Sequence, residues 1–91
     1  MFDLDRAWTL HPQVALRPEA FGALAYNFGT RRLSFLKSPA LVDVVATLDA
    51  HPRARDACRA AGVGDEELPD FEHALATLAR TGMIAARETD R

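Results

Sequence analysis

The sequence predicts a small α+β domain of winged helix-turn-helix-like type, in which a three-stranded antiparallel sheet is followed by three helices. Short segments up to residue 36 either alternate apolar with polar residues or are rich in apolar and aromatic ones, as strands are. From Ser38 onward, apolar residues recur at helical spacing. A glycine-containing loop gives the last two helical segments helix-turn-helix proportions. Residues 1–91 are enough for a single domain with one modest core.

The three strands are expected over residues 13–17, 21–27 and 30–36. Pro18 lacks a backbone donor and has a fixed φ, so residues 17–20 are predicted to form a turn. Asn27, Phe28 and Gly29 fit a tight hairpin in which Gly29 takes the left-handed conformation.

The third strand carries both apolar and basic side chains. Strand alternation places Leu33 and Phe35 on one face, and Arg32, Ser34 and Leu36 on the other. We expect Leu33 and Phe35 to anchor the sheet to the helices. If the strand order follows the chain, this strand lies at an edge of the sheet.

The helices are expected over residues 39–49, 53–61 and about 65–81, with an extended tail over 83–86. Ser38 is a good N-cap, Pro39 suits the first helical position, and Gly82 is the predicted C-cap of the third helix. The third helix has an apolar stripe that we expect in the core: Leu68, Phe71, Leu75 and Leu78. Small residues beside this stripe leave either a shallow groove or tight packing, and the sequence does not decide between them: Ala74, Ala76 and Ala79.

Composition narrows the class of protein. A single cysteine excludes an intramolecular disulfide and fits a reducing compartment. The first ten residues lack the pattern of a signal peptide, and no apolar run approaches the length of a membrane span, so we expect a cytoplasmic protein without membrane contact. A pI near 5.8 argues against general nucleic-acid binding. We expect residues 1–9 and 87–91 to be loosely ordered.

The motifs of catalysis and metal binding are absent from the sequence. It has no phosphate-binding glycine loop, no paired-cysteine spacing and no cluster of histidines, since His11, His51 and His73 are far apart. Cys58 lies among alanines, where a small buried side chain is expected rather than a nucleophile. We therefore expect no enzymatic activity, no metal and no cofactor.

Basic residues gather on the predicted edge strand of this acidic chain, whose net charge is −2. Arg31, Arg32 and Lys37 fall within seven residues. Charge on an edge strand protects it against aggregation, and it also allows the edge to accept an acidic extended peptide. The residues alone leave both interpretations open.

A winged-helix DNA-binding regulator is the alternative function. Acidic residues at the start of the third helix oppose it, because that helix would approach phosphates: Glu66, Glu67, Asp70 and Glu72. The arginines of the second helix suggest either a solvated face or a contact with an acidic partner: Arg53, Arg55 and Arg59. A homodimer that pairs two edge strands is a further possibility.

The segments HPQVALRPEAFGALAYNFGTRRLSFLKSPALVDVV, HPRARDACRAAGV and FEHALATLARTGMI resemble the MftB family of peptide chaperones in mycofactocin biosynthesis. These chaperones are relatives of PqqD within the RiPP precursor-peptide recognition elements. The resemblance covers nearly all of residues 8–84, and RPEAFGALAYNFGTRRLSFLKS is its most specific part.

The resemblance implies a winged-helix domain that binds the glutamate-rich leader of a ribosomally made precursor peptide and presents it to a radical S-adenosylmethionine (SAM) maturase. The leader adds as an extra strand beside the third strand, in a cleft that the third helix closes. By this resemblance the peptide-binding residues are expected to be Arg31, Arg32, Leu33, Ser34, Phe35, Lys37, Ala74 and Leu78.

Overall fold

The computed structural model describes residues 2–87 and has the predicted α+β architecture. Strands β2 (Val14–Glu19), β3 (Gly22–Asn27) and β4 (Arg32–Leu36) form an antiparallel sheet in that order. The helical part comprises α1 (Pro39–Ala46), the 3₁₀ turn η1 (Leu48–Ala50), α2 (Ala54–Ala60) and α3 (Leu68–Arg80). Short strands β1 (Trp8–Leu10) and β5 (Ile84–Ala86) pair antiparallel as a second, two-stranded sheet. This arrangement is compatible with a winged helix.

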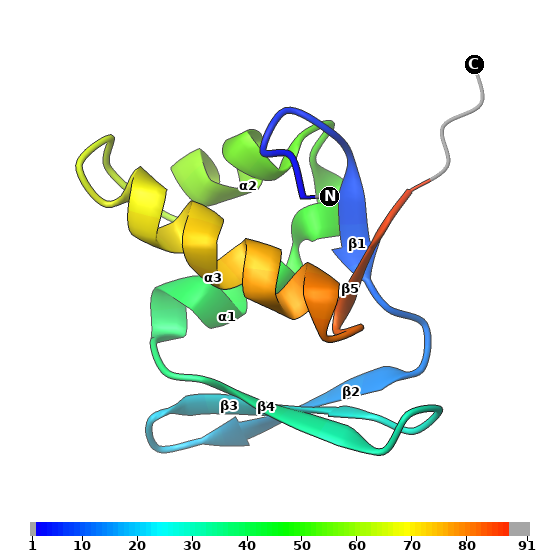
Figure 1. Cartoon of the computed structure of the whole chain (residues 1–91). Coiled ribbons are helices and arrows are strands. Elements are labelled where there is room, and N and C mark those ends of the chain that lie inside the picture. Colours follow the sequence, from blue (N-terminus) through cyan, green and yellow to red (C-terminus); the bar gives the residue numbers. More distant parts are fainter. Residues whose placement is uncertain (1, 88–91) are drawn as a thin grey trace.

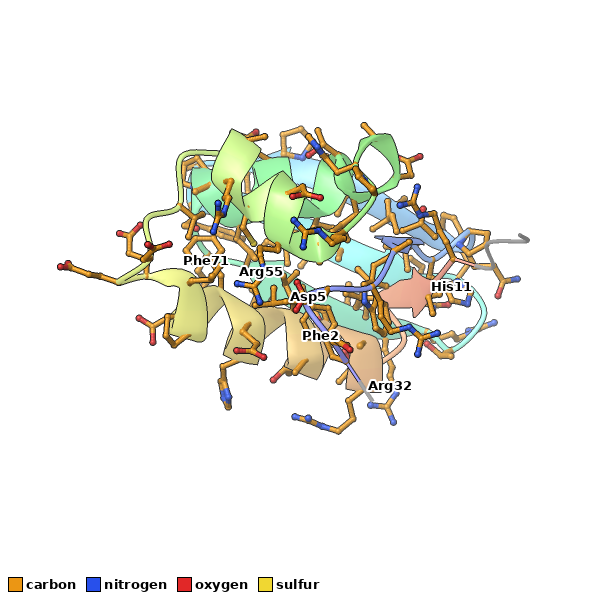
Figure 2. The ribbon with its side chains drawn as sticks, turned by 90° about the horizontal axis from the view of Figure 1, so that it is seen from above. Phe2, Asp5, His11, Arg32, Arg55 and Phe71 are labelled. Carbon is orange, nitrogen blue, oxygen red and sulfur yellow. The ribbon has the colours of Figure 1, made fainter. Side chains whose placement is uncertain are left out.

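The helices cover one face of the three-stranded sheet, as Figure 1 shows with the sheet below the helical layer. The core lies between these layers and includes Leu36, Val44, Leu48 and Leu75, all without exposed surface. The predicted apolar stripe of α3 is confirmed as core: Leu75 and Leu78 are buried, and Leu68 and Phe71 pack against the cluster. Figure 2 shows Phe71 pointing from α3 toward α2.

The prediction of which side chains of the edge strand pack against the helices is wrong. Leu33 and Phe35 are 56% and 59% exposed and lie on the outer face of the sheet, whereas Leu36 is completely buried. Their row pairs with Tyr26 and Leu24 of β3, while the buried row of β3 consists of small residues and Asn27. Alternation specifies which residues share a face, but tertiary packing decides which face is buried.

Two predicted turns also differ from the structure. Residues 17–19 continue β2, because Pro18 is tolerated on an edge strand. In the β3–β4 hairpin, the left-handed residue is Arg31, with φ of 63°, and not Gly29. Gly29 instead allows the side chain of Gln13 to approach, since a Cβ there would lie 2.1 Å from Gln13 Oε1.

The helix ends follow the sequence signals. Ser38 accepts a hydrogen bond from the Leu41 N–H, 3.1 Å, and Pro39 begins α1, so the predicted N-cap is confirmed. The C-cap of α3 is Thr81 and not the predicted Gly82, which follows it in the left-handed conformation with φ of 82° and ends the helix. The predicted tail over residues 83–86 is β5.

The N-terminal segment, expected to be loosely ordered over residues 1–9, contributes Leu4 and Trp8 to the core. Its carbonyl groups cap α2, because the N–H groups of Ala54 and Arg55 donate to the oxygens of Arg6 and Leu4. At the other end, Arg87 donates to the carbonyls of Asp49 and His51, and residues 88–91 lie outside the described residues.

Asn27 joins the two halves of the domain. Its side chain is 1% exposed, and its Nδ2 donates to the Gly82 carbonyl at 2.8 Å. Its Oδ1 accepts from the N–H groups of Gly29 and Thr30, at 2.8 and 3.1 Å. One buried amide therefore fixes the β3–β4 hairpin to the turn between α3 and β5.

Gly22→Ala should lower the free energy of unfolding by about 2 kcal/mol or more. Gly22 has φ of 147°, and an added Cβ would lie 2.2 Å from the Leu36 carbonyl oxygen, a backbone atom that cannot move away alone. Gly64→Ala is the matched control, because a Cβ there meets no atom within 4 Å. Urea unfolding measures both variants, and equal stabilities would contradict the proposed clash.

Asn27→Ala should lower the free energy of unfolding by about 2–4 kcal/mol, because the Gly82 carbonyl and two hairpin N–H groups lose their partner. Thr30→Ala removes only a weak acceptor for the Arg32 N–H at an exposed position, so it serves as the control. Thermal unfolding of the two variants measures the difference. A loss below about 0.5 kcal/mol for Asn27→Ala would show that the amide is dispensable.

Candidate functional site

The free edge of β4 is the main candidate site. The order β2-β3-β4 confirms the prediction that the basic strand is an edge. Alternate residues of an edge strand direct their N–H and C=O groups away from the sheet, where another strand can pair with them. The opposite edge, on β2, is interrupted by Pro18, which offers no N–H.

The basic residues of this edge are exposed and free of ion pairs within the described part of the chain. Arg31 lies in the hairpin, Arg32 begins β4 and Lys37 follows it. None of the three is within ion-pair distance of a described carboxylate, whereas Arg17 pairs with Glu19. Figure 2 shows Arg32 extending from the domain at the end where α3 finishes. Their charge is therefore available to an acidic ligand.

The predicted contact residues of β4 divide between two faces. Leu33 and Phe35 point outward, and Phe35 lines a shallow hollow of about 220 Å³ with Phe21 and Lys37. Ser34 is half-buried on the side of the helices. A strand added at this edge would thus meet apolar side chains on its outer side and polar ones on its inner side.

The α3 residues of the predicted cleft lie in the packed part of that helix. Leu78 is 5% exposed and Ala74 is half-buried, and neither lines the larger hollow on α3. That hollow, of about 720 Å³, lies between the second half of α3, β5 and the N-terminal segment. Ala76 and Ala79 line this hollow together with Phe2 and Trp8. Of the two alternatives that the sequence left open, a groove is therefore found where α3 lies next to β5. Figure 2 shows Phe2 next to this half of α3.

The arginines of α2 hold the N-terminal segment. Arg55 donates to both carboxylate oxygens of Asp5, at 2.7 and 3.1 Å, and Arg53 pairs with Asp5 and Asp56. The contact between Asp5 and Arg55 is visible in Figure 2. Arg59 is exposed. The role of Arg53 and Arg55 in the fold is thus explained without a ligand.

The start of α3 is acidic and exposed, as the sequence indicated. Glu66 and Glu67 precede the helix, and Asp70 and Glu72 lie on its exposed side. These carboxylates complement the helix dipole. They would repel the phosphates that the second helix of a helix-turn-helix approaches on DNA.

Other kinds of site find little support in residues 2–87. No group of three or more His, Cys, Asp or Glu side chains there is placed to hold a metal ion. Cys58 has no exposed surface, which confirms its expected burial, and this burial raises the pKa of its thiol. No helix in this range has the length and apolar character needed to cross a membrane.

Sequence reasoning missed the apolar outer face of the sheet. Phe21 and Phe28 flank β3 and are 44% and 60% exposed. A signal for them was present, because both phenylalanines lie at or next to predicted turns and connecting segments run over the protein surface. The prediction assigned Leu33 and Phe35 to the core and so removed the residues that complete this face.

Fold and site together define a small α+β domain with an open, basic sheet edge. The model of the Peptide chaperone MftB family matches residues 7–85. The chain therefore belongs to the Peptide chaperone MftB family.

Three relatives are named Peptide chaperone MftB. The one from Mycobacterium ulcerans is 56% identical over 90 residues, covering 99% of this chain and 83% of the relative. The one from Mycobacterium tuberculosis is 56% identical over 88 residues, covering 97% and 81%. The one from Mycolicibacterium smegmatis is 54% identical over 83 residues, covering 91% and 81%. No solved structure gives a significant match.

Asp5→Asn should destabilise the domain at neutral pH, and the difference from the parent should begin to shrink as the pH falls below about 4. Hydrogen bonding to the Arg55 guanidinium holds the pKa of Asp5 below its ordinary value of 3.8. A lowered folded-state pKa gives stability that is present above the unfolded pKa and is lost as Asp5 is protonated in the fold.

Thermal unfolding from pH 3 to pH 7 measures this dependence. Asp65→Asn is the matched control, because Asp65 is exposed and makes no ion pair with the described residues. A constant difference between Asp5→Asn and the parent over the whole range would show that the ion pairs with Arg53 and Arg55 do not contribute.

Proposed function

We propose that the protein is a peptide chaperone that binds the leader of a ribosomally synthesised precursor by strand addition to β4 and presents it to a radical SAM maturase of mycofactocin biosynthesis. The relatives' name, Peptide chaperone MftB, supports a peptide as the partner. The open edge of β4 with its unpaired basic side chains is the observation that carries the mode of binding.

Backbone pairing and side-chain charge would have separate tasks at this edge. Main-chain hydrogen bonds to β4 supply affinity for an extended chain with little choice of sequence. Arg31, Arg32 and Lys37 supply selectivity for an acidic leader, since each lacks a carboxylate partner in the described structure. The acidic remainder of the domain would repel nucleic acid.

Strand alternation would divide the residues of an added leader between the two faces of the sheet. Leader residues on the outer side would lie beside Leu33 and Phe35, both more than half exposed. Those on the inner side would lie beside Arg32 and Ser34 and, further along, toward α3. The proposed leader therefore alternates apolar with acidic residues along the paired segment.

Catalysis and DNA binding are less well supported. The family name describes a chaperone, so we propose that the maturase supplies both the catalysis and its cofactor. A DNA-binding regulator would need a basic recognition helix, and α3 exposes Asp70 and Glu72 instead. Self-pairing of two β4 edges would bring the basic residues of both copies together, which electrostatic repulsion disfavours.

Reversing the charge at the edge, with Arg31→Glu and Arg32→Glu, should weaken binding of a synthetic glutamate-rich leader at least tenfold, about 1.4 kcal/mol. The affinity should also depend less on salt, because two cationic partners are lost. Fluorescence anisotropy at two salt concentrations measures both effects. The control is Arg6→Glu with Arg59→Glu, an equal charge change at exposed residues far from the sheet. Equal losses in both variants would indicate a general charge effect.

Strand addition is tested separately with leaders methylated at single backbone nitrogens. Methylation should abolish binding at alternate positions only, because every second N–H of an added strand faces β4. A ¹⁵N-HSQC titration should then concentrate its shifts in residues 30–37. Uniform tolerance of methylation would reject strand addition while leaving peptide binding intact.

A further inference from the structure

The outer face of the three-stranded sheet has no covering element in the described structure. In Figure 1 the helices all lie on the opposite side of the sheet. All four large apolar side chains that the described structure leaves well exposed lie on this face or at the turns that border it: Phe21, Phe28, Leu33 and Phe35. Contiguous exposed apolar side chains on a small domain are typical of a contact site.

The side chains of this face are already ordered by contacts with each other. Phe21 packs edge-to-face on Phe35, with ring centroids 5.8 Å apart, and Tyr26 packs on Phe28 at 5.3 Å. Leu33 lies opposite Tyr26 in the strand register. Aromatic side chains held in place lose little conformational entropy when a partner covers them.

The charge around the face indicates the chemistry of its partner. Residues 14–37 carry four basic side chains and one acid, Glu19, which pairs with Arg17. Three of the basic side chains border the outer face, Arg17, Arg31 and Lys37, whereas Arg32 belongs to the inner row of β4. The rest of the chain carries seven basic and twelve acidic residues. A second copy would place one basic rim against another, which disfavours sheet-to-sheet dimerisation. A surface with an apolar centre and a carboxylate rim is complementary.

We infer that the outer face of β2, β3 and β4 is a docking surface for a second protein whose contact area is apolar at its centre and acidic at its rim. The inference rests on the proposed function in one respect: the occupant is the maturase to which the leader is presented. The leader adds at the edge, and the maturase covers the face next to it.

The two sites are contiguous through β4. A leader paired with β4 extends the sheet by one strand, and its outward side chains join the row of Leu33 and Phe35. A maturase on this face would therefore touch the domain and the leader together. Bound leader should raise the affinity for the maturase severalfold, and the maturase should raise leader affinity by the same factor.

The test uses Phe28→Ser, which removes an exposed aromatic ring of this face that packs on Tyr26 of β3 and, unlike Phe21, makes no ring contact with Phe35 of the proposed leader site. Maturase binding is measured by biolayer interferometry with purified maturase, and leader binding by fluorescence anisotropy. We expect maturase affinity to fall tenfold or more while leader affinity stays within twofold. Phe2→Ser, which removes a half-buried phenylalanine that packs on Trp8 beside the other hollow, is the control and should leave both affinities unchanged. Circular dichroism verifies the fold of each variant.

Each other outcome overturns the inference. Parental maturase affinity in the Phe28→Ser variant places the docking surface elsewhere and leaves the proposed function intact. Loss of leader affinity in that variant assigns the face to the leader. If sedimentation shows that the parent is a dimer and the variant a monomer, the occupant of this face is a second copy of the chain. If the parent does not bind the maturase but still binds the leader, the maturase is not the occupant of this face. The proposed delivery step then fails, and leader capture stands.

Discussion

The arrangement of the domain depends on one buried amide, that of Asn27. It lies at the end of the central strand, where the small residues Ala23 and Ala25 occupy the rest of the buried row. By accepting from the hairpin and donating to Gly82, it binds the sheet to the turn that closes α3. Because a buried amide without partners is costly, it also specifies which face of β3 turns inward. The pairing register of β3 with β4 then determines which side chains of β4 turn toward the core.

Which face of each strand is buried is the property that the sequence predicted least well. Order and type of the elements follow from local signals, such as Ser38 at the start of α1 and Gly82 after α3, and the structure confirms them. The grouping of Leu33 with Phe35 was likewise local and correct. Which group is buried depends on contacts with residues far along the chain, among them the Asn27 contact with Gly82, 55 residues away. Alternation with a period of two carries no information on that choice.

The N-terminal segment was missed for a related reason. Trp8–Leu10 is too short to give a strand signal, and it pairs with Ile84–Ala86 at the opposite end of the chain. Its attachment also depends on carbonyls that cap α2 and on Asp5 between two arginines. Backbone caps of this kind leave no mark in the sequence. The basic charge of β4, in contrast, was predictable, because three cations within seven residues are a local property. Its place at the edge followed only on the condition that the strand order follows the chain, which the structure confirms.

Charge separates the surfaces of this small domain. Arg53 and Arg55 are used within the fold, whereas Arg31, Arg32 and Lys37 have no described partner. Leaving three cations unpaired gains nothing for stability, since exposed ion pairs contribute little and lone exposed charges contribute less. Their position on an open edge is therefore explained by protection against edge-to-edge aggregation or by the peptide binding proposed above. The exposed aromatic side chains on the adjoining face favour binding, because burying them inside would have stabilised the domain more. Both features lie on the three-stranded sheet, while the helices supply the core that keeps it in place.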